Sequence, residues 1–147
     1  MSGLAFLSQE LDTKLHSASP AQQRAASLVA CQFALAKARI EAPVVANALA
    51  ELRAGRAFSP SLKAQLDSLA EKLDEQYFDL KDAAEAGTAD PKQWQDMFAK
   101  ARAVTALSNA GDEDAYKAAA ESIYEAAFTI LDDNKQELLA MVEAALE

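Results

Sequence analysis

The amino-acid sequence predicts an all-α protein, and three features of its composition predict it. Of the 147 residues, 35 are Ala and 18 are Leu, two residues that rank at the top of helix propensity. Only five Val and three Ile supply the β-branched aliphatic side chains that are enriched in strands. The four Gly and four Pro are too few for the frequent turns of a β-rich fold. We expect a single helical domain over residues 1–147, packed as an irregular antiparallel bundle of six or seven helices.

Proline residues mark the places where helices are predicted to begin. Ser19, Ser59 and Asp90 each stand immediately before a proline. A proline at the first helical position loses no hydrogen bond, and the preceding Ser or Asp side chain can accept one from a free N–H of the first turn. Pro43 instead follows Ala42, which has no capping side chain, so the chain is expected to turn sharply there between two helices.

Glycine residues mark the places where helices are predicted to end. Gly55, Gly87 and Gly111 are each expected to take the left-handed conformation that follows a helix C-terminus. The intervening connections are short, so consecutive helices are predicted to be antiparallel neighbours. The expected helices span residues 4–15, 20–41, 43–54, 60–86, 91–110, 113–131 and 135–147, with Asp132, Asp133 and Asn134 separating the last two.

The predicted helices differ in the width of their apolar faces. Between Ala25 and Ala38 only three polar residues interrupt an apolar run, so the helix over 20–41 is predicted to be the central one. The helix over 60–86 is amphipathic, because its apolar residues recur at steps of three and four. Its predicted buried stripe consists of Leu62, Leu66, Leu69, Leu73, Tyr77, Leu80 and Ala84.

The charge of the chain is strongly negative and unevenly distributed. The formal net charge is −9. Residues 1–66 carry seven Lys or Arg and four Asp or Glu, whereas residues 67–147 carry seven Lys or Arg and nineteen Asp or Glu. Such a surface repels phosphate backbones, which argues against general nucleic-acid binding, and it attracts basic proteins. The sequence has no uncharged apolar stretch long enough to span a membrane, and its first residues lack the basic segment of a signal peptide. A cytoplasmic protein without membrane contact is therefore expected.

The sequence offers no constellation of residues for catalysis or for metal binding. It contains one His and one Cys, whereas a zinc site needs three or four such ligands. Cys31 lies in an apolar run and is predicted to be a small core residue, and His16 is predicted to stabilise the end of the first helix. Glycine-rich phosphate-binding motifs are absent. We expect no catalytic residues, no bound metal and no cofactor.

Two arginines form a possible anion site. Arg53 and Arg56 stand just before the helix predicted to begin at Pro60. Guanidinium groups beside free helix N–H groups can hold a phosphate or carboxylate. The simpler alternative is that Arg53 complements the end of the preceding helix and that Gly55 stops it.

The most prominent candidate for function is an acidic face on the helix over 60–86. Its carboxylates recur at helical spacing, and Phe78 lies closer to them by helical phase than Tyr77 does. An exposed aromatic ring among carboxylates is a frequent arrangement at binding hot spots. The alternative is that these carboxylates only form a solvated surface. The acidic face consists of Asp67, Glu71, Glu75, Phe78, Asp79 and Asp82.

These observations favour a protein-interaction module that binds a basic protein partner through the acidic face. Small size and acidity are also typical of immunity proteins and antitoxins that block cationic toxins, an analogy that rests on charge and size alone. One alternative is a small-ligand-binding or enzymatic bundle with a pocket between helices. Another is a structural subunit that forms a homodimer through alanine-rich helix faces.

Overall fold

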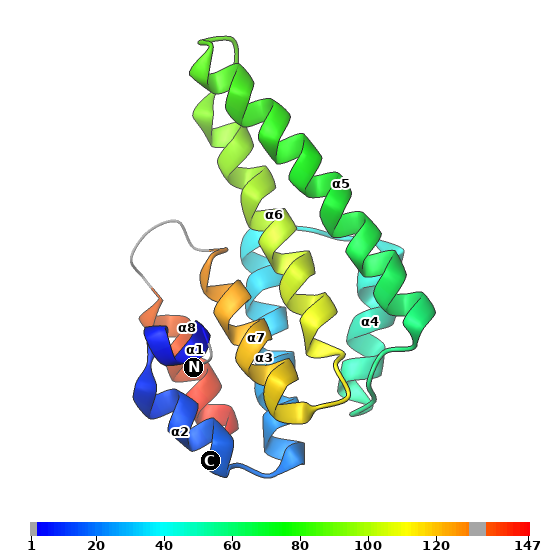
Figure 1. Cartoon of the computed structure of the whole chain (residues 1–147), viewed down its shortest axis with the longest axis vertical. Helices are drawn as coiled ribbons and strands as arrows, with labels where there is room; N and C mark the ends of the chain where they lie inside the picture. The colour runs from blue at the N-terminus through cyan, green and yellow to red at the C-terminus, as the bar shows by residue number, and fades with distance from the viewer. Residues whose placement is uncertain (1–2, 130–134) are drawn as a thin grey trace.

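The computed structural model describes residues 3–129 and 135–147, and all regular secondary structure in these ranges is α-helical (Figure 1). The all-α prediction is confirmed. The helices are α1 (Gly3–Leu7), α2 (Gln9–Ser17), α3 (Pro20–Ala38), α4 (Pro43–Arg53), α5 (Pro60–Glu85), α6 (Pro91–Ala110), α7 (Ala115–Ala127) and α8 (Gln136–Ala145).

The described residues form eight helices rather than six or seven, because the helix expected over residues 4–15 is divided at Ser8. This residue has an extended backbone (φ −161°), and its Oγ accepts a hydrogen bond from the N–H of Leu11 at 3.1 Å. Ser8 is therefore the N-cap of α2. A serine at this position favours a new helix start over continuation, because its side chain satisfies an otherwise free N–H group.

The helix starts that the prolines predicted are confirmed. Ser19 caps α3 in a reciprocal capping box with Gln22, and the Ser59 hydroxyl accepts from the N–H of Leu62 at 3.1 Å. Asp90 accepts from the N–H of Lys92 at 2.9 Å. Ala42 makes no side-chain cap, as expected.

The helix ends agree with prediction at two glycines and disagree at the third. Gly55 and Gly87 have φ values of 74° and 79°, in the left-handed region. Gly111 has φ −87°, so the prediction of a left-handed conformation there is wrong. A different requirement accounts for this glycine, because a Cβ built on Gly111 would overlap the ring of Phe58. The N–H of Phe58 also donates to the Gly111 carbonyl at 2.9 Å, which fixes the loop before α5 against the end of α6.

Two helix boundaries differ from the sequence-based expectation. The helix that was predicted to reach residue 41 ends at Ala38, because Arg39 takes a left-handed conformation (φ 56°, ψ 45°) and turns the chain. The helix expected from residue 113 begins at Ala115, because the Asp114 carboxylate accepts from the N–H of Lys117 and acts as N-cap. The predicted break at residues 132–134 lies outside the described residues.

Within the described residues, two helices, α3 and α6, each pack against four others. α3 packs against α4, α6, α7 and α8, and α6 packs against α3, α4, α5 and α7. α1 and α2 lie against α7, and the two chain termini lie at the same end of the molecule (Figure 1). Cys31 on α3 is fully buried, as its apolar surroundings predicted.

The pair α5 and α6 extends well beyond the remaining helices (Figure 1). The last buried residue on α5 is Leu73, and the first on α6 is Ala99. Between them, over residues 74–98, no residue is buried. We call this two-helix projection the arm. It places the C-terminal half of α5 away from the body of the protein.

Candidate functional site

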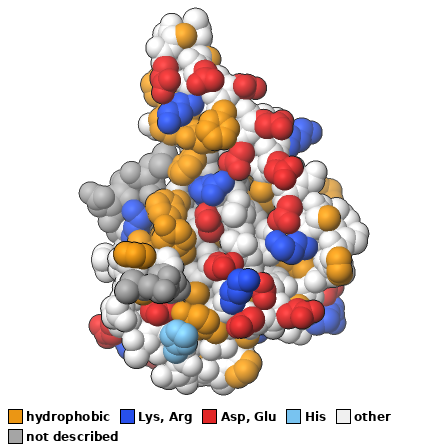
Figure 2. All heavy atoms as spheres, in the orientation of Figure 1, with side chains coloured by type: hydrophobic (Ala, Val, Ile, Leu, Met, Phe, Trp, Pro, Cys, Tyr) orange, Lys and Arg blue, Asp and Glu red, His pale blue; other side chains and the backbone are white. Residues whose placement is uncertain are grey.

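The acidic face follows the outer side of α5 and continues onto the arm. Figure 2 shows Asp and Glu side chains recurring along this helix. Four of its carboxylates are exposed, and no ion pair within residues 3–129 and 135–147 engages them. These four residues are Glu71, Glu75, Asp79 and Asp82.

Asp67 belongs to a different environment from the other carboxylates of the acidic face. One of its oxygens accepts from Ser108 Oγ on α6 at 2.5 Å, and Lys63 Nζ lies 3.4 Å from its carboxylate. Lys63 also donates to the Ser108 hydroxyl at 2.9 Å. Asp67 therefore fastens α5 to α6 within the body, and the unpaired carboxylates begin one turn later.

Phe78 is exposed and Tyr77 is half-buried, as helical phase predicted. The Phe78 side chain is 58% exposed and stacks on Tyr77 at a centroid distance of 4.8 Å. Tyr77 in turn contacts the rings of Trp94 and Phe98 on α6. Phe78 thus has one face supported by the aromatic cluster inside the arm and the other open among carboxylates.

The aromatic cluster and a cation hold the two helices of the arm together. Lys81 on α5 lies over the ring of Trp94 on α6, with 5.6 Å between Nζ and the ring centroid, and over Tyr77 at 5.9 Å. Cation–π contacts of this kind stabilise a site that has no buried core. The apolar stripe predicted for the helix over 60–86 includes Tyr77. The contact of Lys81 with Trp94 could not be predicted, since helical periodicity carries no information about pairing between two helices.

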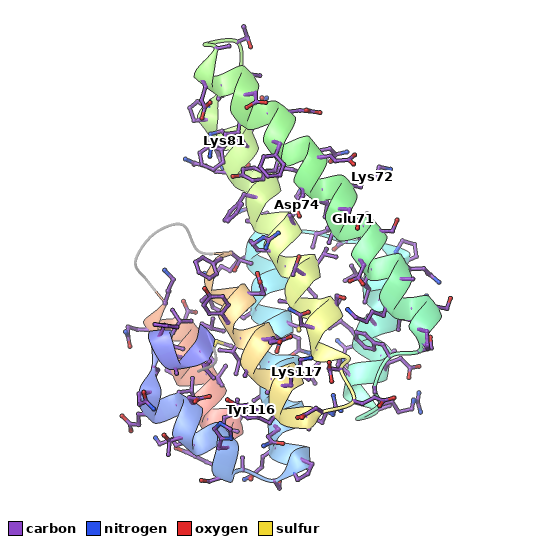
Figure 3. All side chains as sticks on the ribbon, viewed as in Figure 1. Glu71, Lys72, Asp74, Lys81, Tyr116 and Lys117 are labelled. Carbon is purple, nitrogen blue, oxygen red and sulfur yellow. The ribbon has the colours of Figure 1, made fainter. Side chains whose placement is uncertain are left out.

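A polar network lies at the base of the arm. Arg102 on α6 donates to both oxygens of Asp74 on α5, at 3.0 and 3.2 Å, and to Glu125 on α7 at 3.2 Å. In Figure 3 Asp74 lies on the side of α5 that faces α6, whereas Lys72 lies on the opposite side. Burial raises the pKa of Glu125, although Arg102 opposes this effect. The network ties three helices together where the arm leaves the body.

The two arginines proposed as an anion site have different surroundings in the structure. Arg56 forms an ion pair with Glu51, with 2.7 Å between Nε and Oε2, and this contact lowers the pKa of the Glu51 carboxyl. Arg53 is exposed and lies in a different surface hollow, beside Arg24 and the start of α3. The hydrogen-bonding capacity of Arg56 is thus largely taken by Glu51.

The contacts of His16 and the burial of Cys31 indicate that both residues have structural roles. The His16 ring stacks on Tyr116 at a centroid distance of 3.8 Å, and its Nε2 lies 3.9 Å from Asp12. The Tyr116 hydroxyl donates to Asp12 at 2.5 Å, so this group joins α2 to α7. Burial raises the pKa of the Cys31 thiol well above its ordinary value, which opposes formation of the nucleophilic thiolate.

The described residues contain neither a metal-binding cluster nor a membrane-spanning helix. No group of three or more His, Cys, Asp or Glu side chains in residues 3–129 and 135–147 is arranged to hold a metal ion. None of the helices described is both long enough and apolar enough to cross a membrane. Comparisons with protein-family models, with curated proteins and with solved structures find no significant match.

Proposed function

We propose that this chain is a protein-interaction module that binds a basic protein partner through the acidic face of α5. One observation carries the proposal. Four exposed carboxylates without ion-pair partners in the described structure surround an aromatic ring that is 58% exposed, and all five side chains lie on one side of a single helix. The helix positions are 71, 75, 78, 79 and 82, which repeat at close to helical spacing.

The carboxylates and the ring have different roles in this proposal. Unpaired surface carboxylates create a negative potential that accelerates encounter with a cationic partner. They contribute little to folding, so their accumulation on one side of α5 is not explained by a need for stability. A partly supported aromatic ring such as Phe78 can enter a pocket on the partner without first losing much side-chain freedom, since Tyr77 already restrains it.

The arm presents this surface for docking. Because α5 and α6 extend beyond the other helices, a partner can approach the C-terminal half of α5 without contacting α1, α2 or α8 (Figure 1). The finer proposal is a cytoplasmic protein that blocks a cationic protein, in the manner of an immunity protein or antitoxin. The net charge of −9 and the short chain support this form of the function.

The proposal is tested by affinity capture with paired baits. The wild-type chain and a variant with Glu71, Glu75 and Asp79 all changed to Lys are immobilised and exposed to a lysate of the native host at low and high salt. We expect the wild type to retain a basic protein that the variant does not retain, with the retention weakened at high salt because screening shortens the range of attraction.

A matched control separates the acidic face from total charge. It changes Glu41, Glu113 and Glu121 to Lys, which are three exposed carboxylates on other segments. The control has the same net charge as the first variant and is expected to retain the basic protein. If the wild type retains no basic protein, or if both charge-reversed baits lose it equally, the acidic face is only a solvated surface.

A second candidate function is favoured by one observation, an apolar groove between α3 and α4. It has a volume of about 520 Å³ and is lined mainly by Leu35, Ile40, Ala42, Pro43, Val45, Ala46 and Leu49. Grooves of this size and composition suit small apolar ligands. Ala46→Trp should fill the groove, so a fluorescent apolar probe that binds wild type and binds the variant equally well would remove this candidate.

A further inference from the structure

A small pocket lined mainly by cationic side chains lies where α3 ends against α6, and its charge is opposite to that of the acidic face. It has a volume of about 250 Å³. Its floor contains two small buried side chains, Ala38 and Ala99, which leave space beneath the charged groups. The charged side chains that line it are Lys37 and Arg39 from the end of α3 and Lys92, Asp96 and Lys100 from α6.

Positive charge is concentrated in this pocket on a chain whose net charge is −9. Four cationic side chains line it against one carboxylate. Asp96 pairs with Lys92 at 3.3 Å, and Lys37 lies 3.9 Å from Glu137. No ion pair with a described residue engages Arg39 or Lys100, and Lys100 is half-buried. Arg39 is exposed, so the charges of both side chains are free to interact with a small anion in the pocket.

The backbone conformation of Arg39 is unusual for a residue other than glycine. Arg39 is the one non-glycine residue with a positive φ in the described ranges, at φ 56°. Gly or Asn usually occupies such a position at a helix end, because a Cβ is disfavoured there. This turn ends α3 and brings the Arg39 side chain to the pocket that Lys100 also lines.

We propose that this pocket binds a small phosphate-bearing anion. Arg39 supplies a planar set of donors that matches phosphate oxygens, and Lys100 supplies a point charge at the wall of the pocket. The volume is below that of pockets for drug-sized ligands, which restricts the ligand to the size of pyrophosphate or a small phosphate ester. A nucleic acid is disfavoured, because a polymer that crossed this pocket would extend along the negatively charged remainder of the chain.

The test is calorimetric titration of the full chain at constant ionic strength. Inorganic phosphate, pyrophosphate and glycerol phosphate are the probes, and their order of affinity distinguishes free phosphate from a phosphate ester as the source. We expect at least one of them to bind with one site per chain. The double variant Arg39→Gln/Lys100→Gln should weaken that binding by about tenfold or more, because each side chain provides a charge-assisted interaction.

The matched control is Lys72→Gln/Lys117→Gln, which removes two exposed cations outside the pocket and should bind within about twofold of wild type. Arg39→Gly removes the Arg39 side chain in a variant that is expected to fold as stably as the wild type. Glycine adopts the left-handed conformation without strain, so the melting temperature of this variant should equal that of the wild type or exceed it by about 2–4 °C. Its affinity for the anion should nevertheless fall. The proposal is overturned if no probe binds wild type, if the control and the pocket variant weaken binding equally, or if a single-stranded oligonucleotide binds more tightly than the probes.

Discussion

Arg102 of α6 holds both carboxylate oxygens of Asp74 on α5 at the point where the arm leaves the body. The same guanidinium reaches Glu125 on α7, and its Nε has no hydrogen-bond partner among the described residues. The positive charge of Arg102 is largely buried, and the carboxylates of Asp74 and Glu125 compensate it. This contact and the aromatic cluster beyond it join α5 to α6 along the arm.

The first prediction concerns Asp74. Asp74→Asn removes one of the two counter-charges of Arg102 and should destabilise the protein by about 1–2 kcal/mol, within the range for hydrogen bonds to charged groups. Urea denaturation measures this change. Asp79→Asn, at an exposed and unpaired carboxylate one turn away on the same helix, should unfold like the wild type. Equal effects of the two substitutions would mean that the Asp74 contact does not stabilise the base of the arm.

The second prediction concerns the pH dependence contributed by Glu125. Burial raises the pKa of Glu125 in the folded protein, so its stabilising contribution is full below the ordinary pKa and is lost as the pH rises through the folded value. Glu125→Gln retains a neutral side chain at every pH. The unfolding free energy of the wild type relative to the variant should therefore decline between pH 4 and pH 7. A difference that stays constant or grows over this range would contradict the assigned burial of Glu125.

Most of the helical framework could be predicted because its determinants are local in sequence. Ser19, Ser59 and Asp90 each satisfy an N–H group two or three residues ahead, so a short window of sequence contains both partners. The division at Ser8 uses the same local chemistry, but it was not predicted because the apolar pattern continues across it. Gly111 could not be interpreted correctly from its neighbours, since the side chain that requires it is Phe58, more than fifty residues away.

The third prediction distinguishes the left-handed backbone of Gly87 from the close packing of Gly111 against Phe58. Gly87→Ala places a Cβ in open space and should cost about 1 kcal/mol, which reflects only the left-handed backbone. Gly111→Ala has an ordinary φ but forces the Phe58 ring to move, and overpacking of this kind costs about 1–3 kcal/mol. In a Phe58→Ala background the Gly111→Ala substitution should cost little. Thermal denaturation of the wild type, the two single variants Gly111→Ala and Phe58→Ala, and the double variant gives the coupling free energy. An absent coupling would refute the close-packing explanation.

The candidate site could be predicted only in part. Helical phase placed Phe78 outward and Tyr77 inward, because the period of one helix determines its exposed side. The same pattern could not show that Asp67 is engaged by Ser108, since that residue comes from α6. The basic pocket was missed entirely. Its cations come from two segments more than fifty residues apart, and neither segment alone has an unusual charge.

The binding proposal is tested most directly by the association rate constant with the captured basic protein. Stopped-flow measurement compares the wild type with the variant in which Glu71, Glu75 and Asp79 are changed to Lys. We expect the variant to associate at least about tenfold more slowly, and the wild-type rate to fall as salt rises from 0.1 to 1 M, where the Debye length shrinks from about 10 to about 3 Å. Phe78→Ala should instead raise the dissociation rate. An association rate of the charge-reversed variant equal to that of the wild type would contradict the assignment of the acidic face as a docking surface.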